Sequence, residues 1–153
     1  MTTEDIKNEF LQQMDCSQVV AGAFADALGM DRRTLRKMSA CFGGGMHCGE
    51  TCGAVTGALM VIGLNYGHSD NGDATQKDIM RQKVTEFKEK FAEKYDSCLC
   101  RDLLGHDVAQ PGELERVLEK GLLLSFCPIV VKDVLDILDS MIKPKEDGEE
   151  KFD

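Results

Sequence analysis

Apolar residues recur at helical spacing along most of this chain, and glycines mark the places where that spacing breaks. Within residues 74–95, for example, Met80, Val84, Phe87 and Phe91 form one apolar stripe. Glycine is unfavourable inside a helix and common just after one. No segment alternates apolar and polar residues over the length of a strand. The sequence therefore predicts an all-α fold, a compact bundle of about six to eight helices.

Capping residues indicate where several of these helices begin. Asp15 is placed to cap a helix that starts at Cys16, and Asp31 is placed to cap a second, shorter one. Cys127 and Pro128 open the last helix, since proline suits a first turn. Its inward face is expected to consist of Val130, Val131, Val134, Leu135, Leu138 and Met141.

The composition is that of a globular chain with an acidic surface. Its 153 residues suit one helical domain, expected over residues 1–143, with a charged, frayed tail over residues 144–153. The net charge of −9 argues against nucleic acid and anionic membranes as partners. Residues 1–10 lack the apolar segment of an export signal, and residues 52–66 are too few to cross a membrane. We therefore expect a cytoplasmic protein without membrane insertion.

Seven cysteines are many for that compartment. Cytosolic thiols are kept reduced, so disulfides rarely hold such folds together. One or two cysteines would be read as small buried apolar residues. Seven in 153 residues predict redox chemistry or metal binding.

The segment of residues 41–53 concentrates the unusual residues. Three consecutive glycines predict a loop over residues 42–49, followed by a helix over residues 50–66. Cys52 would lie in the first turn of that helix, where unpaired N–H groups and the helix dipole lower a thiol pKa. Bare backbone can approach an anion, a sulfide or a cluster closely, which makes four glycines candidates for cofactor binding: Gly43, Gly44, Gly45 and Gly53.

Small residues also predict a close helix contact. Gly53 and Gly57 stand four residues apart beside Ala54 and Ala58. Their face can receive another helix of the same chain, which we favour, or a second copy in a homo-oligomer.

Two local cysteine pairs suggest one composite site. Cys48 with Cys52, and Cys98 with Cys100, could together supply a four-thiolate site of zinc or iron–sulfur type. The spacing departs from the usual zinc signature, in which two residues separate the members of a pair. His47 is a candidate ligand or proton relay, although a solvent-facing loop histidine is the favoured interpretation.

Five separated motifs resemble the family named for its signature, C_GCAxxG_C_C, whose members are regarded as redox-active. The matching stretches occur in the family's order and are residues 16–18, 42–46, 52–58, 100–105 and 127–128. The likeness extends over roughly residues 5–142. It implies a helical fold and a redox or metal role, usually in anaerobic prokaryotes.

The resemblance further implies a set of signature cysteines, one from each of four helix ends: Cys16, Cys52, Cys100 and Cys127. By this comparison the other three cysteines are additions of this sequence. We expect Cys41 to be a buried filler, and Cys48 and Cys98 to be auxiliary thiols.

The leading hypothesis is that the four signature cysteines converge in one small electropositive pocket. They would either cycle between thiols and disulfides, with Cys52 as the nucleophile, or ligate an iron–sulfur cluster or another thiophilic metal. Either form would transfer electrons with an unknown redox partner protein, as an oxidoreductase does. The alternatives are a zinc-binding structural or protein-interaction module without turnover, and a protein of metal trafficking or sensing.

Overall fold

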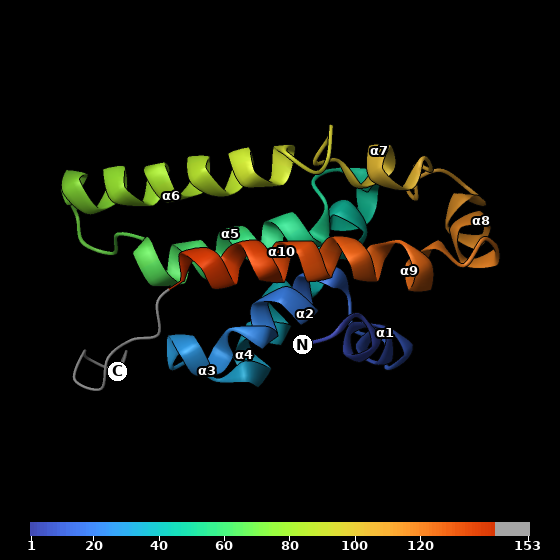
Figure 1. The fold of residues 1–153 in the computed structure, drawn as a ribbon, viewed down its shortest axis with the longest axis horizontal. Helices are drawn as coiled ribbons and strands as arrows, with labels where there is room; N and C mark the ends of the chain where they lie inside the picture. The colour runs from blue at the N-terminus through green and yellow to red at the C-terminus, as the bar shows by residue number, and fades with distance from the viewer. Residues whose placement is uncertain (143–153) are drawn as a thin grey trace.

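Helices make up most of residues 1–142, the part of the chain that the computed structural model describes (Figure 1). In chain order they are α1 (Thr3–Leu11), α2 (Cys16–Ala23), α3 (Ala25–Leu28), α4 (Arg32–Ser39), α5 (Gly53–Tyr66), α6 (Ala74–Ala92), α7 (Cys100–Leu104), α8 (Glu113–Glu119), α9 (Leu122–Ser125) and α10 (Cys127–Met141). Of the helices in this range, seven have seven residues or more, and the range contains no strand. The all-α prediction is confirmed. The predicted tail lies outside the described residues.

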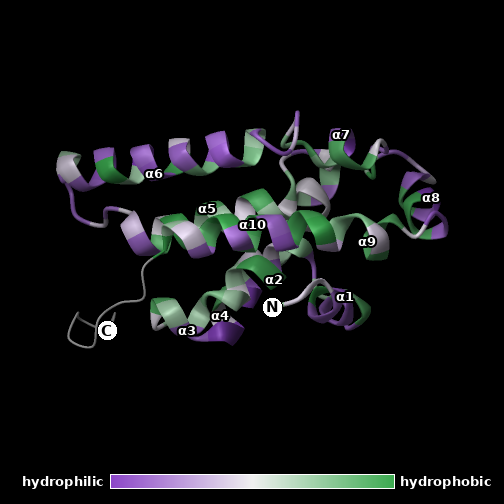
Figure 2. Ribbon diagram, in the orientation of Figure 1, coloured by the Kyte–Doolittle hydropathy of each residue, from purple (hydrophilic) through white to green (hydrophobic). Residues whose placement is uncertain are grey.

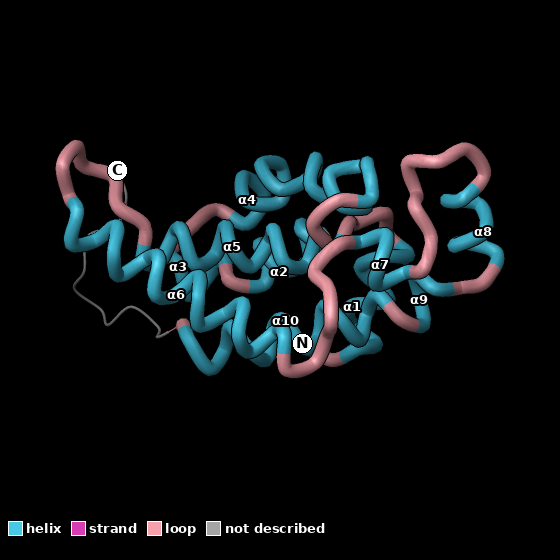
Figure 3. The backbone as a smooth tube through the Cα atoms, turned by 90° about the horizontal axis from the view of Figure 1, so that it is seen from above, coloured by secondary structure: helices cyan, strands magenta, loops and turns pink. Residues whose placement is uncertain are grey.

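Two long helices, α5 and α10, run side by side through the middle of the molecule (Figures 1 and 3). The longest helix, α6, packs along one side of this pair. Helix α2 packs against the opposite side of the pair, and α4 packs against α2. The start of α10 lies at the same end of the molecule as α7, α8 and α9. Several helix N-termini are thereby gathered near one end of the central pair.

The core lies along α5 and the inner face of α10 (Figure 2). All six residues predicted for that inner face are buried, because they recur at helical spacing on one side of α10. Phe87 and Phe91 of the predicted α6 stripe are also buried, and each contributes about 1.5–3 kcal/mol by leaving water. Within the described residues, no helix combines the length and apolar character that a membrane crossing requires.

The predicted capping residues occupy the N-cap positions, Asp15 in α2 and Asp31 in α4. The Asp15 N–H donates to the side-chain oxygen of Gln18 at 3.0 Å, at the start of α2. At the start of α4, the Thr34 N–H donates to the Asp31 carboxylate at 2.8 Å. Cys127 is the first residue of α10, with proline following in the first turn.

The helix predicted for residues 50–66 starts three residues late, at Gly53. Before it, Thr51 forms an antiparallel bridge with Leu99, so the backbone is extended rather than helical. The predicted loop is a tight turn in which Met46 and His47 adopt left-handed conformations. A bridge this short leaves no alternating pattern in the sequence, which is why the sequence predicted a helix there.

The small-residue face of α5 packs against α2 of the same chain. A β-carbon at Gly57 would lie 2.9 Å from the carbonyl oxygen of Ser17 and 3.0 Å from the β-carbon of Val20. Only a residue without a side chain allows the two backbones to come this close. The predicted intrachain contact is confirmed.

Gly57→Ala tests this contact against Gly63→Ala, a change in the same helix. No atom lies within 4 Å of where a β-carbon at Gly63 would be. We expect Gly57→Ala to lower the free energy of unfolding by about 1–3 kcal/mol through overpacking. Gly63→Ala should raise it by up to about 1 kcal/mol, because alanine favours a helix more than glycine does. Urea unfolding followed by circular dichroism measures both, and equal effects would contradict the contact.

Candidate functional site

Each of the four signature cysteines stands at the start of a helix. Cys16, Cys100 and Cys127 are the first residues of α2, α7 and α10, and Cys52 is the N-cap of α5. The first N–H groups of a helix have no partner within it and point toward its N-terminal end. The four cysteines thus stand at helix ends, as the family resemblance implied, although Pro128 leaves Cys127 with fewer N–H donors beside it.

Two glycines allow these helix starts to approach one another. A β-carbon at Gly53, next to Cys52, would lie 3.2 Å from the β-carbon of Cys16. A β-carbon at Gly45 would lie 2.9 Å from the β-carbon of Cys100, and Gly45 also has a positive φ of 63°. Any side chain at these positions would push the cysteine-bearing segments apart. The glycine-rich loop is thus part of the wall around the cysteines.

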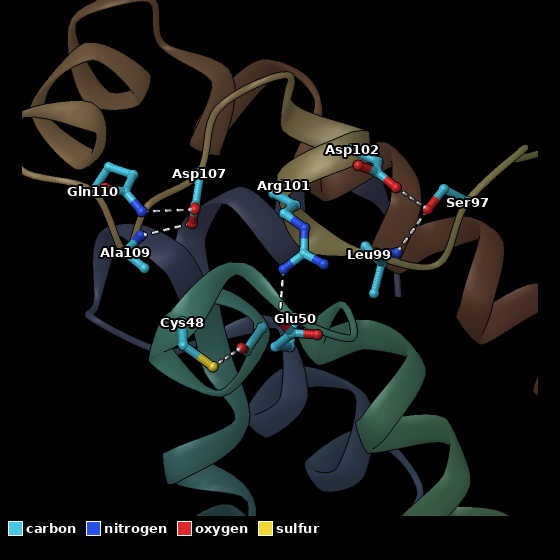
Figure 4. A network of polar contacts seen from close by, with 10 residues as sticks. Cys48, Glu50, Ser97, Leu99, Arg101, Asp102, Asp107, Ala109 and Gln110 are labelled. Atoms are coloured by element: carbon cyan, nitrogen blue, oxygen red, sulfur yellow. Dashed lines mark hydrogen bonds and ion pairs between the residues drawn. The ribbon is translucent and has the colours of Figure 1, made fainter.

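A short two-stranded pairing joins the start of α5 to the start of α7. The Cys52 N–H donates to the carbonyl of Cys98 at 2.8 Å, and the Cys100 N–H donates to the carbonyl of Glu50 at 2.7 Å. Beside it, the guanidinium of Arg101 contacts the Glu50 carboxylate at 2.5 Å (Figure 4). These contacts hold Cys52 and Cys100 on adjacent segments although 47 residues of chain separate them.

Cys16 and Cys127 are direct neighbours. The pKa of Cys16 is raised well above its ordinary value, first by a hydrogen bond with the Cys127 side chain and then by burial. The charge of Cys127, when ionised, raises the pKa of Cys16 further. The starts of α2 and α10 therefore bring one pair of thiols into contact.

Cys52 and Cys100 extend this pair into a cluster. The pKa of Cys52 is raised to about 12, chiefly by burial and next by the charge of Cys16. The pKa of Cys100 is also raised to about 12, by burial, then by Cys52 and Cys16. The four signature cysteines therefore lie in one region of the structure, although no three of them are arranged to hold a metal ion.

The prediction that Cys52 has the lowest thiol pKa is wrong. The N–H groups of Ala54 and Val55, in the first turn of α5, lower the pKa of Cys52 as expected. Burial raises that pKa by more, since Cys52 is only 8% exposed and a thiolate there loses its water. A helix start activates a thiol only where the thiol keeps contact with solvent.

The expectation of an electropositive pocket is also wrong, because carboxylates act on these thiols. Asp15 raises the pKa of Cys16, and Asp107 raises that of Cys100. The pKa of Asp15 is itself raised by burial, while the charge of His47 lowers it. Asp107 accepts a hydrogen bond from the Ala109 N–H at 3.1 Å (Figure 4). The sequence identified Asp15 only as a cap and carried no signal for Asp107.

The remaining three cysteines are exposed. Cys41 is not the buried filler that was expected, because Ser39 turns inward instead and donates to the Leu35 carbonyl at 2.8 Å. Cys48 lies in the glycine-rich turn, with its thiol donating to the Gly45 carbonyl at 3.3 Å. Cys48 and Cys52 consequently share no helix face.

The candidate ligands of the described residues, the four signature cysteines included, do not complete a metal site. Within residues 1–142, no three Cys, His, Asp or Glu side chains are arranged to hold a metal ion. His47, an exposed residue of the turn, is near Asp15 rather than part of a ligand set. An iron–sulfur or zinc centre therefore remains a prediction from the sequence.

The four candidate glycines mostly contact protein atoms. Gly43, Gly45 and Gly53 are buried, and Gly44 is partly exposed. A β-carbon at Gly43 would collide with the Asp15 carboxyl group. These contacts account for the glycines by close packing, and cofactor binding by their backbone stays a prediction.

Comparison with known proteins gives one match. A family model described as "Putative redox-active protein (C_GCAxxG_C_C)" matches residues 14–141, which include all seven cysteines. No curated protein and no solved structure shows significant similarity to the chain.

Alkylation of the folded protein tests the burial of the cluster. At about pH 8, a thiol whose pKa is about 12 is a thiolate in about one molecule in ten thousand, and only the thiolate reacts readily. We expect iodoacetamide to modify Cys41, Cys48 and Cys98 long before Cys52 and Cys100, as peptide mass spectrometry will show. In denaturant all seven should react alike. If Cys52 reacts in the folded protein as fast as Cys98, the arrangement described here is incorrect.

Proposed function

Since this chain belongs to the C_GCAxxG_C_C family of redox-active proteins, we propose that it transfers electrons by thiol–disulfide exchange at the Cys16–Cys127 pair. The observation that carries the proposal is the closeness of these two side chains, which belong to the first residues of two packed helices, α2 and α10. Two thiols in contact can form a disulfide without a large movement of the backbone.

The surroundings of the Cys16–Cys127 pair favour both its reduced form and its disulfide form. A hydrogen bond with the Cys127 side chain, burial and the charge of Asp15 raise the pKa of Cys16, so Cys16 is held as a neutral thiol in the reduced pair. The disulfide is neutral as well, so oxidation leaves no charge in the buried site. A thiolate that forms on Cys16 during exchange is stabilised by backbone N–H groups at the start of α2.

Oxidation of the pair releases two electrons and two protons. Both are taken up by a disulfide of a redox partner protein, which becomes two thiols while the sulfur–sulfur bond forms between Cys16 and Cys127. Cys52 and Cys100 are the candidates for the next thiols in exchange, because the Gly53 backbone beside Cys52 approaches Cys16 and the segment of Cys100 pairs with that of Cys52.

Disulfide mapping after redox equilibration tests the proposal. The protein is equilibrated anaerobically in mixtures of reduced and oxidised dithiothreitol and then trapped with acid. We expect one two-electron transition in which Cys16 and Cys127 become linked, and Cys16→Ser and Cys127→Ser should each abolish it. The surface variant Cys41→Ser is the matched control and should leave the transition unchanged.

The same preparation separates the alternatives. A visible absorption band with bound iron would support a cluster on the four signature cysteines. One tightly held zinc, with no accessible thiol transition, would support the structural or interaction module. A metal that exchanges readily between chelators would support trafficking or sensing. Any of these, found without the Cys16–Cys127 disulfide, would contradict the proposal.

A further inference from the structure

Cys98 lies directly opposite Cys52 in the short antiparallel pairing. Thr51 and Leu99 form the bridge, and the Cys52 N–H donates to the Cys98 carbonyl at 2.8 Å. In this register Cys52 and Cys98 are cross-strand neighbours whose side chains share one face of the pairing. Residues directly opposite each other in an antiparallel pair have α-carbons about 4.5–5.5 Å apart. Disulfides span about 4.4–6.8 Å between α-carbons, so the two cysteines are placed to form one.

The two members of this pair differ in their access to solvent. Cys98 is exposed, whereas Cys52 is buried at 8% exposure. Behind Cys52, the adjacent Gly53 backbone approaches the β-carbon of Cys16, and Cys16 contacts Cys127. The series therefore leads from the exposed Cys98 to the buried Cys52, then to Cys16, which is half-buried, and to the buried Cys127.

An apolar groove lies beside the exposed member of the series. Its volume is about 330 Å³, and Cys98 lines it together with mostly apolar and aromatic residues and a polar edge of Thr51, Lys88, Asp96 and Ser97. Tyr95 forms part of its wall and is fixed there, because its hydroxyl donates to the Asp133 carboxylate at 2.7 Å. An apolar group bonded to a sulfur atom could bind in this groove while that sulfur contacts the sulfur of Cys98.

We propose that Cys98 is the surface thiol through which the buried cysteines exchange electrons, by way of a transient Cys98–Cys52 disulfide, with an apolar disulfide as co-reactant. This proposal rests on the proposed function, and it adds the route by which electrons reach the inner pair. It also gives a role to a cysteine outside the four signature positions.

The reaction begins at the surface. The Cys98 thiolate attacks one sulfur of the disulfide R–S–S–R, the S–S bond breaks, and RS⁻ leaves and takes up the proton that Cys98 lost. The Cys52 thiolate then attacks the Cys98 sulfur of the mixed disulfide. The second RS⁻ leaves with the proton from Cys52, and a Cys98–Cys52 disulfide remains.

Two exchanges inside the protein complete the transfer. Cys16 attacks Cys52 and releases Cys98 as a thiol, and Cys127 then attacks Cys16 and releases Cys52 as a thiol. Two electrons and two protons have passed from Cys16 and Cys127 to R–S–S–R, which has become two RSH. Each step joins cysteines whose chain segments are neighbours in the structure.

The test uses the full chain and 4,4′-dithiodipyridine, a neutral apolar disulfide whose reduced product absorbs in the near ultraviolet. In Cys98→Ser we expect the Cys16–Cys127 disulfide to form about tenfold more slowly or worse, because exchange depends on access to the attacking thiol. Cys41→Ser and Cys48→Ser also remove exposed thiols but should react at the wild-type rate. In Cys52→Ser, the mixed disulfide on Cys98 should accumulate and be visible by mass spectrometry.

The outcomes distinguish this route from the proposed function. If Cys98→Ser forms the Cys16–Cys127 disulfide as fast as the wild type, Cys98 is not the surface thiol, and the inner redox pair still stands. If the wild type forms no Cys16–Cys127 disulfide under any condition, the proposed function fails and the route fails with it. Slowing by Cys41→Ser or Cys48→Ser equal to that of Cys98→Ser would also overturn the proposal.

Discussion

The close contact between α2 and α5 is the constraint on which the rest of the structure depends. Gly57 lies against Ser17, and Gly53 lies against Cys16, so the two backbones meet where side chains would normally keep them apart. Because α5 and α10 form the centre of the molecule, this contact places the start of α2 at the start of α5 and near that of α10. The cysteine cluster is a consequence of that packing.

Two opposing effects then set the chemistry of the cluster. The helix starts supply N–H groups that favour thiolates, whereas burial and the carboxylates of Asp15 and Asp107 favour thiols. Burial dominates at Cys52, whose pKa is raised to about 12 although two backbone N–H groups act against the rise. In the reduced state, the buried thiols of Cys52 and Cys100 therefore react slowly with other molecules. Such a site needs an exposed thiol to begin exchange, and three exposed cysteines are available among the described residues.

Much of the fold could be predicted from the sequence, because periodicity and caps are local signals. The inner face of α10, the cap at Asp15 and the small-residue contact of α5 were all predicted correctly. The pairing of Thr51 with Leu99 could not be predicted, since one bridge between distant residues leaves no local pattern. The pKa of Cys52 was mispredicted for a related reason, because burial depends on tertiary packing, whereas a helix start is visible in the sequence.

The most direct test of the central claim is carbon-13 NMR of the cysteine β-carbons during an anaerobic redox titration. These signals distinguish a thiol from a disulfide at each residue. If Cys16 and Cys127 are the inner redox pair, their signals will change together, at one midpoint and over a two-electron transition, while Cys41 remains reduced. Independent changes at Cys16 and Cys127, or no change at either, would contradict the account.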